Sequence, residues 1–124
     1  MTIPALQIGD VISARFPEQN PQGREQEGYR PAIVVGLPSQ LGSLRFPVII
    51  VVPLTTDKGQ NWATESPDLY PKFPVGTAGL NHASIALLDQ IRVLDVSRIY
   101  KYRGSLTSEE YQPIWQGIQK MITP

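Results

Sequence analysis

Most of the chain consists of short apolar or alternating segments separated by polar residues, which is the pattern of a β-rich domain. Residues 9–16 alternate with a period of two, and this alternation predicts the first strand. Residues 31–36 and 47–53 are apolar, rich in β-branched side chains and bounded by proline or glycine. The second of these runs has no polar face, so we expect a strand that is buried on both sides.

The middle of the chain is less regular. Residues 55–79 show little periodicity and contain three prolines, so we expect a long loop of the kind that is usually functional or mobile. Two further apolar segments, residues 84–88 and 90–94, flank Asp89 and predict two more strands. On the sequence alone, Asp89 is as readily a turn residue as a functional one.

Helical periodicity occurs at the C-terminal end. Thr107 and Glu110 have the T-x-x-E spacing of a capping box, in which each side chain pairs with a free backbone N–H. The apolar positions that follow at helical spacing are Tyr111, Ile114, Trp115, Ile118 and Ile122. We therefore expect about five short strands and one terminal helix that packs across the sheet, which together form a small, strongly curved barrel.

Composition restricts the classes of function. The chain has 124 residues, which fits a single domain over 1–124. It has no cysteine, and this excludes disulfides, zinc–thiolate sites and thiol nucleophiles and favours a cytoplasmic location. The first residues lack the basic and apolar regions of a signal peptide. The longest apolar run, residues 48–52, is too short to span a bilayer, so we expect no membrane association.

The balance of charge does not by itself indicate nucleic acid. Eleven basic residues match eleven acidic ones, and the formal net charge is zero, whereas a non-specific nucleic-acid-binding domain is typically basic. Any RNA-binding surface must therefore be a local cluster of cations. Arg24, Arg30 and Arg45 are the candidates for that cluster.

Few side chains are available for catalysis. The single histidine, His82, excludes a pair of histidines acting as base and acid, and its polar turn indicates a solvated or capping residue. The acidic residues are too scattered for a metal site, so we expect no metal and no cofactor. Arg30 precedes Pro31 and is therefore extended, and its guanidinium matches phosphate oxygens. Thr55 and Thr56 follow the buried strand, where their hydroxyls either bind phosphate or simply cap the strand.

Four blocks of sequence resemble the MazF/PemK toxin family. Residues 9–11 resemble the G-D-V/L opening of that family, and residues 23–32 meet every fixed letter of its G-x-E-Q-x-G-x-R-P loop. Residues 53–55 resemble its P-L-T block, and residues 87–92 its L-L-D-Q-I-R block. The blocks occur in the family's order over roughly residues 8–122, so chance similarity is a poor explanation.

The resemblance implies a mainly β fold with helical additions: a small SH3-like barrel of the CcdB/PemK type, with a C-terminal helix, that forms homodimers. It also implies the toxin of a type II toxin–antitoxin system, a metal-independent and sequence-specific endoribonuclease. Such an enzyme cuts single-stranded RNA to a 2′,3′-cyclic phosphate and is neutralised by a cognate antitoxin.

By position, the resemblance assigns catalysis to Arg30 and Thr55, with Glu25 in the loop that shapes the site. Arginine stays protonated in proteins, so the general base is more readily Glu25 or Asp89. Leu87 stands where some family members carry a catalytic arginine, and this leaves the acid role to Arg30. The residues expected to contact RNA are Gln26, Thr56, Asp89 and Gln90.

Four aromatic residues have two interpretations each. Trp62 and Tyr70 either stack on unpaired bases or pin the long loop to the barrel. Tyr111 and Trp115 either form the dimer contact or pack on the barrel.

Two other classes of function share the expected barrel. One is a toxin of the CcdB type, which binds DNA gyrase and has no nuclease activity. The other is an interaction module, or an inactive relative of the nucleases. The combination of Arg30 with Thr55 favours the nuclease over both.

Overall fold

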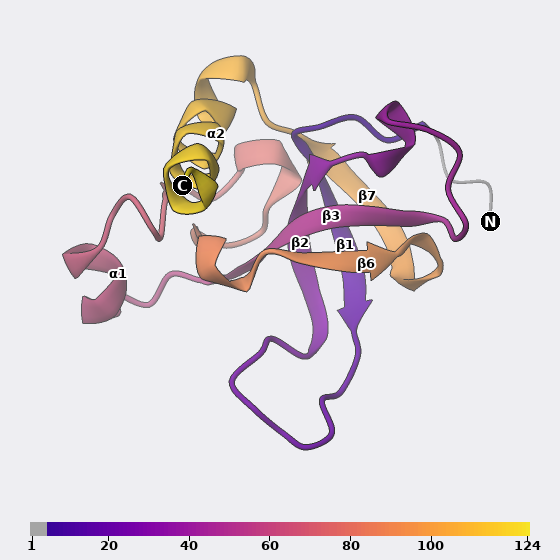
Figure 1. Ribbon diagram of the computed structural model, residues 1–124. Coiled ribbons are helices and arrows are strands. Elements are labelled where there is room, and N and C mark those ends of the chain that lie inside the picture. The colour runs from indigo at the N-terminus through magenta and orange to yellow at the C-terminus, as the bar shows by residue number, and fades with distance from the viewer. Residues whose placement is uncertain (1–4) are drawn as a thin grey trace.

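The computed structural model describes residues 5–124, so the first four residues of the expected domain lie outside the described part. Its strands are β1 (Asp10–Phe16), β2 (Gly28–Gly36), β3 (Val48–Thr56), β4 (Lys72–Phe73), β5 (Ser84–Ala86), β6 (Arg92–Asp95) and β7 (Ile99–Ser105). Its α-helices are α1 (Asn61–Glu65) and α2 (Ser108–Ile122) (Figure 1). The short 3-10 helices are η1 (Pro38–Gln40), η2 (Thr77–Gly79), η3 (Leu88–Gln90) and η4 (Val96–Arg98).

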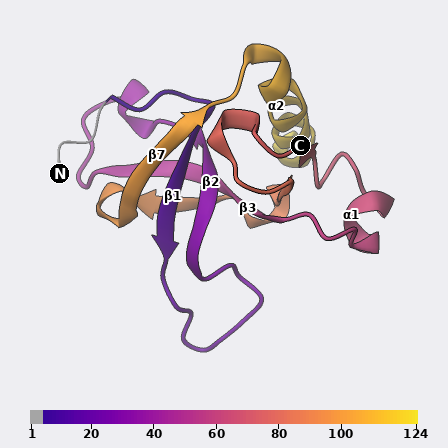
Figure 2. The same ribbon diagram turned by 180° about the vertical axis from the view of Figure 1, so that it is seen from behind.

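The strands form one antiparallel sheet in the order β4-β5-β3-β2-β1-β7, and β6 pairs with β3 beside this path. This confirms the expected class, mainly β with a C-terminal helix. Within residues 5–124 the outer strands β4 and β7 do not pair with each other, so hydrogen bonds do not close the curved sheet into a complete barrel. In both ribbon views α2 lies at the upper end of the sheet, and the connection between β1 and β2 projects from the lower end (Figure 2).

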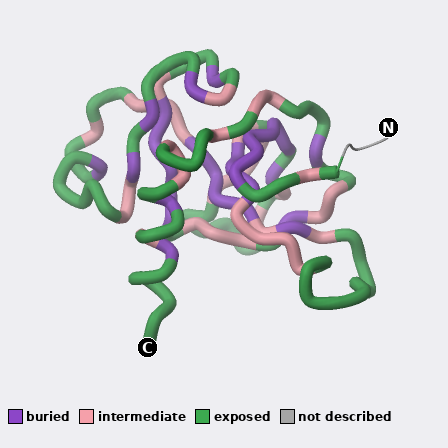
Figure 3. The backbone as a smooth tube through the Cα atoms, turned by 90° about the horizontal axis from the view of Figure 1, so that it is seen from above, coloured by how far each residue is buried: buried purple, intermediate pink, exposed green. Residues whose placement is uncertain are grey.

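The core lies on both faces of the sheet because alternate residues of a strand point to opposite sides. Val11 of β1 and Val52 of β3 belong to the cluster beneath α2, while Ile12 and Val51 belong to a cluster on the other face. The prediction that residues 47–53 form a strand buried on both faces is thus confirmed. Figure 3 shows buried segments along the strands and on part of α2.

Helix α2 begins with the predicted capping box. The Glu110 backbone N–H donates to Thr107 Oγ1 at 3.1 Å, and the Thr107 N–H donates to Glu110 Oε1 at 2.8 Å. Ile114 and Ile118 are buried against the sheet, whereas Trp115 is 49% exposed. The packed face is therefore narrower than the predicted apolar stripe. Among residues 5–124, no helix has the length and apolar character needed to cross a membrane.

Two regions differ from the predicted elements. The expected loop over residues 55–79 contains α1, β4 and η2, and β3 runs on to Thr56. Strand β7 was not predicted. Because it is an edge strand with mostly exposed side chains, it lacks the apolar alternation that marks a strand in a sequence.

Helix η2 lies directly against β7 because each of the two segments has a glycine where it meets the backbone of the other. A Cβ atom built on Gly104 would lie 2.8 Å from the Ala78 backbone, and one built on Gly79 would lie 2.4 Å from the Arg103 carbonyl oxygen. Real Cβ atoms do not come so close to backbone atoms. The contact brings Arg103 Nη1 within 3.4 Å of the Gly79 carbonyl oxygen, to which it donates.

Candidate functional site

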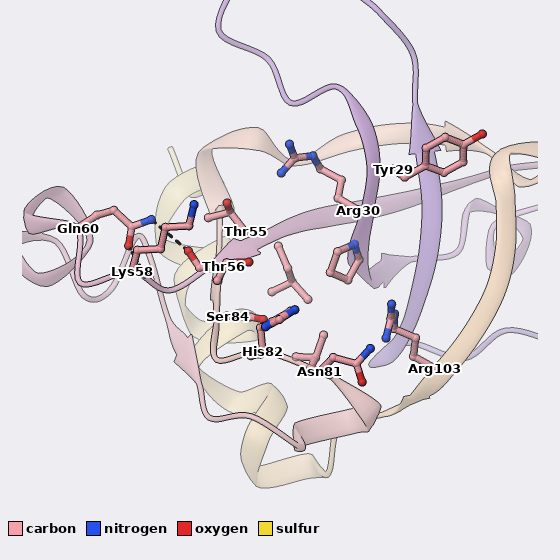
Figure 4. Close-up of a pocket in the computed structure, with 13 residues that line it drawn as sticks. Tyr29, Arg30, Thr55, Thr56, Lys58, Gln60, Asn81, His82, Ser84 and Arg103 are labelled. Atoms are coloured by element: carbon pink, nitrogen blue, oxygen red, sulfur yellow. Dashed lines mark hydrogen bonds between the residues drawn. The ribbon is translucent and has the colours of Figure 1, made fainter.

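Arg30 and Thr55 line one cavity of about 400 Å³, which we call the Arg30 cavity. Side chains enter it from β2, the end of β3, the loop before β5, and β7 (Figure 4). Those that carry charge or donate hydrogen bonds include Arg30, Thr55, Thr56, Lys58, His82 and Arg103.

The pairing of β2 with β3 brings Arg30 to Thr55. Ala32 lies opposite Pro53 in this antiparallel pair, and Arg30 and Thr55, each two residues beyond that pair, follow it on the same face and both line the cavity. The Arg30 Nε donates to the Glu27 carbonyl oxygen at 3.0 Å. Burial lowers the pKa of Arg30 from its ordinary value, yet a guanidinium remains protonated at neutral pH. It therefore supplies a fixed and partly desolvated positive charge.

The residues that line the Arg30 cavity give it a positive character. Lys58 and Arg103 join Arg30 there, and no aspartate or glutamate is among the lining residues. Arg24 and Arg45, which the sequence offered as partners of Arg30, do not line it. The Arg45 guanidinium lies over the Phe46 ring, 5.4 Å from its centroid. A cluster of cations thus forms around Arg30, but its other members are Lys58 and Arg103 and not Arg24 and Arg45.

Thr55 borders a second surface, outside the Arg30 cavity. Thr55 also lines a depression with Gln26, Trp62, Tyr70, Asp89 and Gln90. Asp89 and Gln90 in turn line a neighbouring depression with Glu25. We call these two depressions together the Asp89 groove. Thr55 is the residue that the Arg30 cavity and the Asp89 groove share.

Hydrogen bonds connect the loop before β2 to η3 along this groove. The Gln26 N–H donates to Gln90 Oε1 at 3.3 Å, and Gln90 Nε2 donates to the Arg24 carbonyl oxygen at 3.4 Å. The side chain of Gln90 therefore holds the loop that carries Glu25 and Gln26. This places the two blocks 23–32 and 87–92, far apart in sequence, at one surface.

The two aromatic residues of the long loop contact each other in the Asp89 groove. The rings of Trp62 and Tyr70 are 4.7 Å apart and edge to face. The Tyr70 hydroxyl donates to Asp89 Oδ2 at 2.6 Å, and this hydrogen bond is the main cause that raises the pKa of Tyr70. Trp62 is 43% exposed, so the pair holds the loop in place and still presents a ring surface.

All seven residues predicted from the sequence lie on this continuous surface. Arg30, Thr55 and Thr56 line the cavity, and Glu25, Gln26, Asp89 and Gln90 line the groove. The structure adds Lys58, His82 and Arg103, which carried no recognisable pattern in the sequence. The exposed His82, expected only to be solvated or capping, lines the cavity. No group of three or more histidine or acidic side chains placed to hold a metal occurs among residues 5–124.

Comparisons with known proteins agree on one family. The model of the family described as PemK-like, MazF-like toxin of type II toxin–antitoxin system matches residues 7–122. No curated protein matches the chain in sequence. MazF from Deinococcus radiodurans has a similar structure, with a TM-score of 0.74 and 20% identity over 98% of this chain and 100% of that one.

Two solved complexes are also similar. The MazE–MazF complex from Deinococcus radiodurans gives a TM-score of 0.64 and 21% identity, over 94% of this chain and 95% of that one. A mycobacterial endoribonuclease in complex with its cognate antitoxin gives 0.64 and 16%, over 95% and 93%. At these identities the structural likeness shows the fold, and the family follows from the match over residues 7–122.

Proposed function

Since this chain belongs to the PemK-like, MazF-like family of toxins of type II toxin–antitoxin systems, we propose that it is a metal-independent endoribonuclease that cuts single-stranded RNA at specific sequences. The observation that carries the proposal is the Arg30 cavity. Arg30 and Thr55 meet there among further cations, and no carboxylate lines the space. Such a site attracts a polyanion and leaves an arginine and a hydroxyl to act on a phosphate.

The chemistry is an internal transesterification. The ribose 2′-hydroxyl attacks the adjacent phosphorus, the bond to the 5′-oxygen breaks, and a 2′,3′-cyclic phosphate and a 5′-hydroxyl result. A base removes the 2′ proton, and an acid protonates the departing 5′-oxygen. Arg30 stabilises the negative charge that grows on the phosphoryl oxygens. The Thr55 hydroxyl donates to one of these oxygens and holds the phosphate in line for attack.

Two carboxylates are candidates for the base, and the structure places them differently. Asp89 lines the same depression as Thr55, while Glu25 lines the adjoining part of the Asp89 groove. Arg30 keeps the acid role because its partly desolvated guanidinium, with a lowered pKa, lines the cavity together with Thr55. Gln26, Thr56 and Gln90 contact the RNA on either side of the scissile phosphate.

The proposed partners follow from the same surface. A cognate antitoxin covers the cavity and the groove and excludes RNA. The toxin acts in the cytoplasm as a homodimer. Tyr111 packs against the core cluster beneath α2, whereas Trp115 is 49% exposed, so Trp115 is the candidate that remains free for the dimer contact.

The test is incubation of the purified protein with a long single-stranded RNA in excess EDTA. We expect discrete fragments that end in cyclic phosphate. Arg30→Ala and Thr55→Val should each slow cleavage about 100-fold or more, because each removes a donor aimed at the phosphoryl oxygens. Lys120→Ala, on the exposed face of α2, is the matched control and should cleave normally.

Thermal melting of each variant separates loss of chemistry from loss of fold. Full activity in Arg30→Ala would refute the role of Arg30. Intact RNA across several varied substrates would refute the nuclease and favour the gyrase-binding toxin or the inactive relative.

A further inference from the structure

An exposed pair of tyrosines lies beside the Arg30 cavity. The rings of Tyr29 and Tyr100 are 5.4 Å apart and nearly perpendicular, at 79°. Tyr29 is 69% exposed and Tyr100 is 48% exposed. Neither ring belongs to the core clusters or to the side chains packed against them. The pair therefore contributes little to the core and presents its aromatic surface to solvent.

The backbone aims Tyr100 at this position. Ser13 pairs with Lys101 and Ala14 pairs with Ile99, so a β-bulge leaves Tyr100 as the extra residue of β7. A bulge re-aims the side chain that it carries. On the neighbouring pair of strands Arg15 lies opposite Tyr29. Tyr29, Tyr100 and Arg15 thus come together from three adjacent strands.

Tyr29 connects two hollows of the surface. It lines the Arg30 cavity and also a depression of about 250 Å³ with Arg15, Arg98 and Tyr100, which we call the tyrosine depression. In Figure 4 the Tyr29 ring lies across the cavity from Lys58 and Gln60. Tyr29 and Arg30 are consecutive residues of β2 whose side chains point to opposite sides (Figure 4), so an RNA strand that passes over Arg30 and Thr55 must bend around β2 to reach the Tyr29 ring.

The charge of this joined surface differs sharply from that of the chain. Five of the eleven basic residues, Arg15, Arg30, Lys58, Arg98 and Arg103, line the two hollows, and none of the eleven acidic residues does so. Asp95 lies close to Arg98 and helps to balance it, but its carboxylate accepts the Ser97 N–H at 2.8 Å and caps η4. The surface is positive although the net charge is zero.

We propose that the tyrosine depression is a subsite for single-stranded RNA, where an unpaired base that flanks the scissile phosphate stacks on Tyr29 and Tyr100. Arg15 and Arg98 bind the phosphate of that nucleotide. Exposed aromatic rings between cations are how proteins hold single strands, because every base offers a face for stacking. This inference rests on the proposed nuclease activity and extends its substrate path beyond Arg30 and Thr55.

The experiment compares steady-state cleavage by the wild type and by Tyr29→Ala/Tyr100→Ala. The substrate is a labelled RNA oligonucleotide that contains a cleavage site mapped with the wild type. We expect KM to rise about 10-fold with kcat nearly unchanged, because stacking binds the ground state and the transition state alike. Tyr102→Ala is the matched control, since this ring is 49% exposed on the same strand but lines neither hollow.

A second substrate reports the stacking itself. It carries abasic nucleotides at the positions that flank the cut, one at a time. One such position should raise KM for the wild type and have no further effect in the double alanine variant. Tyr29→Phe/Tyr100→Phe should keep the KM of the wild type, since the rings remain. Should the alanine variant fail to fold, Arg15→Gln/Arg98→Gln takes its place and should raise KM and weaken its dependence on salt.

The outcomes separate the two proposals. No cleavage by the wild type refutes the nuclease. Cleavage by the wild type with an unchanged KM in the alanine variant overturns the subsite. Loss of dimerisation or of antitoxin binding in that variant, with KM for RNA unchanged, also overturns it and assigns the tyrosines to a protein contact.

Discussion

The Arg30 cavity and the Asp89 groove meet at Thr55 but differ in chemistry. The cavity is lined by Arg30, Lys58 and Arg103 and by no carboxylate. The groove contains Glu25 and Asp89 together with Arg92, side-chain amides and an aromatic pair. One side is suited to hold phosphates and the other to exchange protons and to contact bases.

This difference reconciles the zero net charge of the chain with the RNA binding that we propose. Formal charge is a sum over the whole surface, while a phosphate responds to the charges within about a Debye length, roughly 10 Å at 0.1 M salt. Three cations and no carboxylate line the Arg30 cavity, whereas both carboxylates lie in the Asp89 groove, together with Arg92. The zero net charge of the whole chain therefore does not argue against a local RNA-binding surface.

Replacing a carboxylate of the Asp89 groove should have the largest effect on the cleavage rate. Asp89→Asn should lower kcat about 100-fold, because a general base is lost close to Thr55. Glu25→Gln, further along the groove, should cost only a few-fold by the same reasoning. Cleavage rates of the two variants and of the wild type, measured under the same conditions, make the comparison. The reverse ranking would assign the base to Glu25.

Removing one positive charge from the Arg30 cavity should have a smaller effect, seen in the salt dependence of cleavage. Arg103→Gln should reduce the slope of log(kcat/KM) against log salt concentration by about 0.7, the value for one phosphate contact on a single strand. Lys120→Gln on α2 removes the same charge outside the cavity and should leave the slope unchanged. Equal slopes for Arg103→Gln and the wild type would remove Arg103 from the RNA path.

The smallest effect should come from the hydrogen bond between Tyr70 and Asp89. Tyr70→Phe leaves the ring on Trp62 but removes the donor to Asp89 Oδ2. One such bond contributes about 1 kcal/mol, so kcat/KM should change roughly 5-fold. Tyr102→Phe, which removes a hydroxyl bonded to Ser105 Oγ at 2.7 Å, is the control. A loss as large as that of Asp89→Asn would make Tyr70 part of the chemistry.

The sequence predicted those parts whose local pattern matches their environment. The strands over residues 9–16, 31–36 and 47–53 face the core, so alternation predicted the first and continuous apolar runs predicted the other two. The capping box at Thr107 predicted the start of α2. The blocks 23–32 and 87–92 identified the groove through the family resemblance. Their contact through Gln26 and Gln90 depends on the fold, which the sequence pattern does not encode locally.

The missed parts are those in which side chains face solvent. Strand β7 has little apolar alternation, so Tyr100 and Arg103 had no predicted position. Lys58 and His82 lie in loops that only the pairing of β3 with β5 brings beside Arg30. The positive character of the cavity could thus be inferred from the structure and not from the composition.

The close approach of Gly79 to Arg103 and of Gly104 to Ala78 affects how the site tolerates substitution. Arg103 belongs to β7, and it reaches the cavity beside η2, whose backbone is in direct contact with the backbone of β7. A methyl group at either glycine would push η2 and β7 apart and move Arg103 away from the proposed path of the RNA phosphates. Sensitivity to mutation therefore extends to two positions that offer no functional group at all, and a survey restricted to polar residues would overlook them.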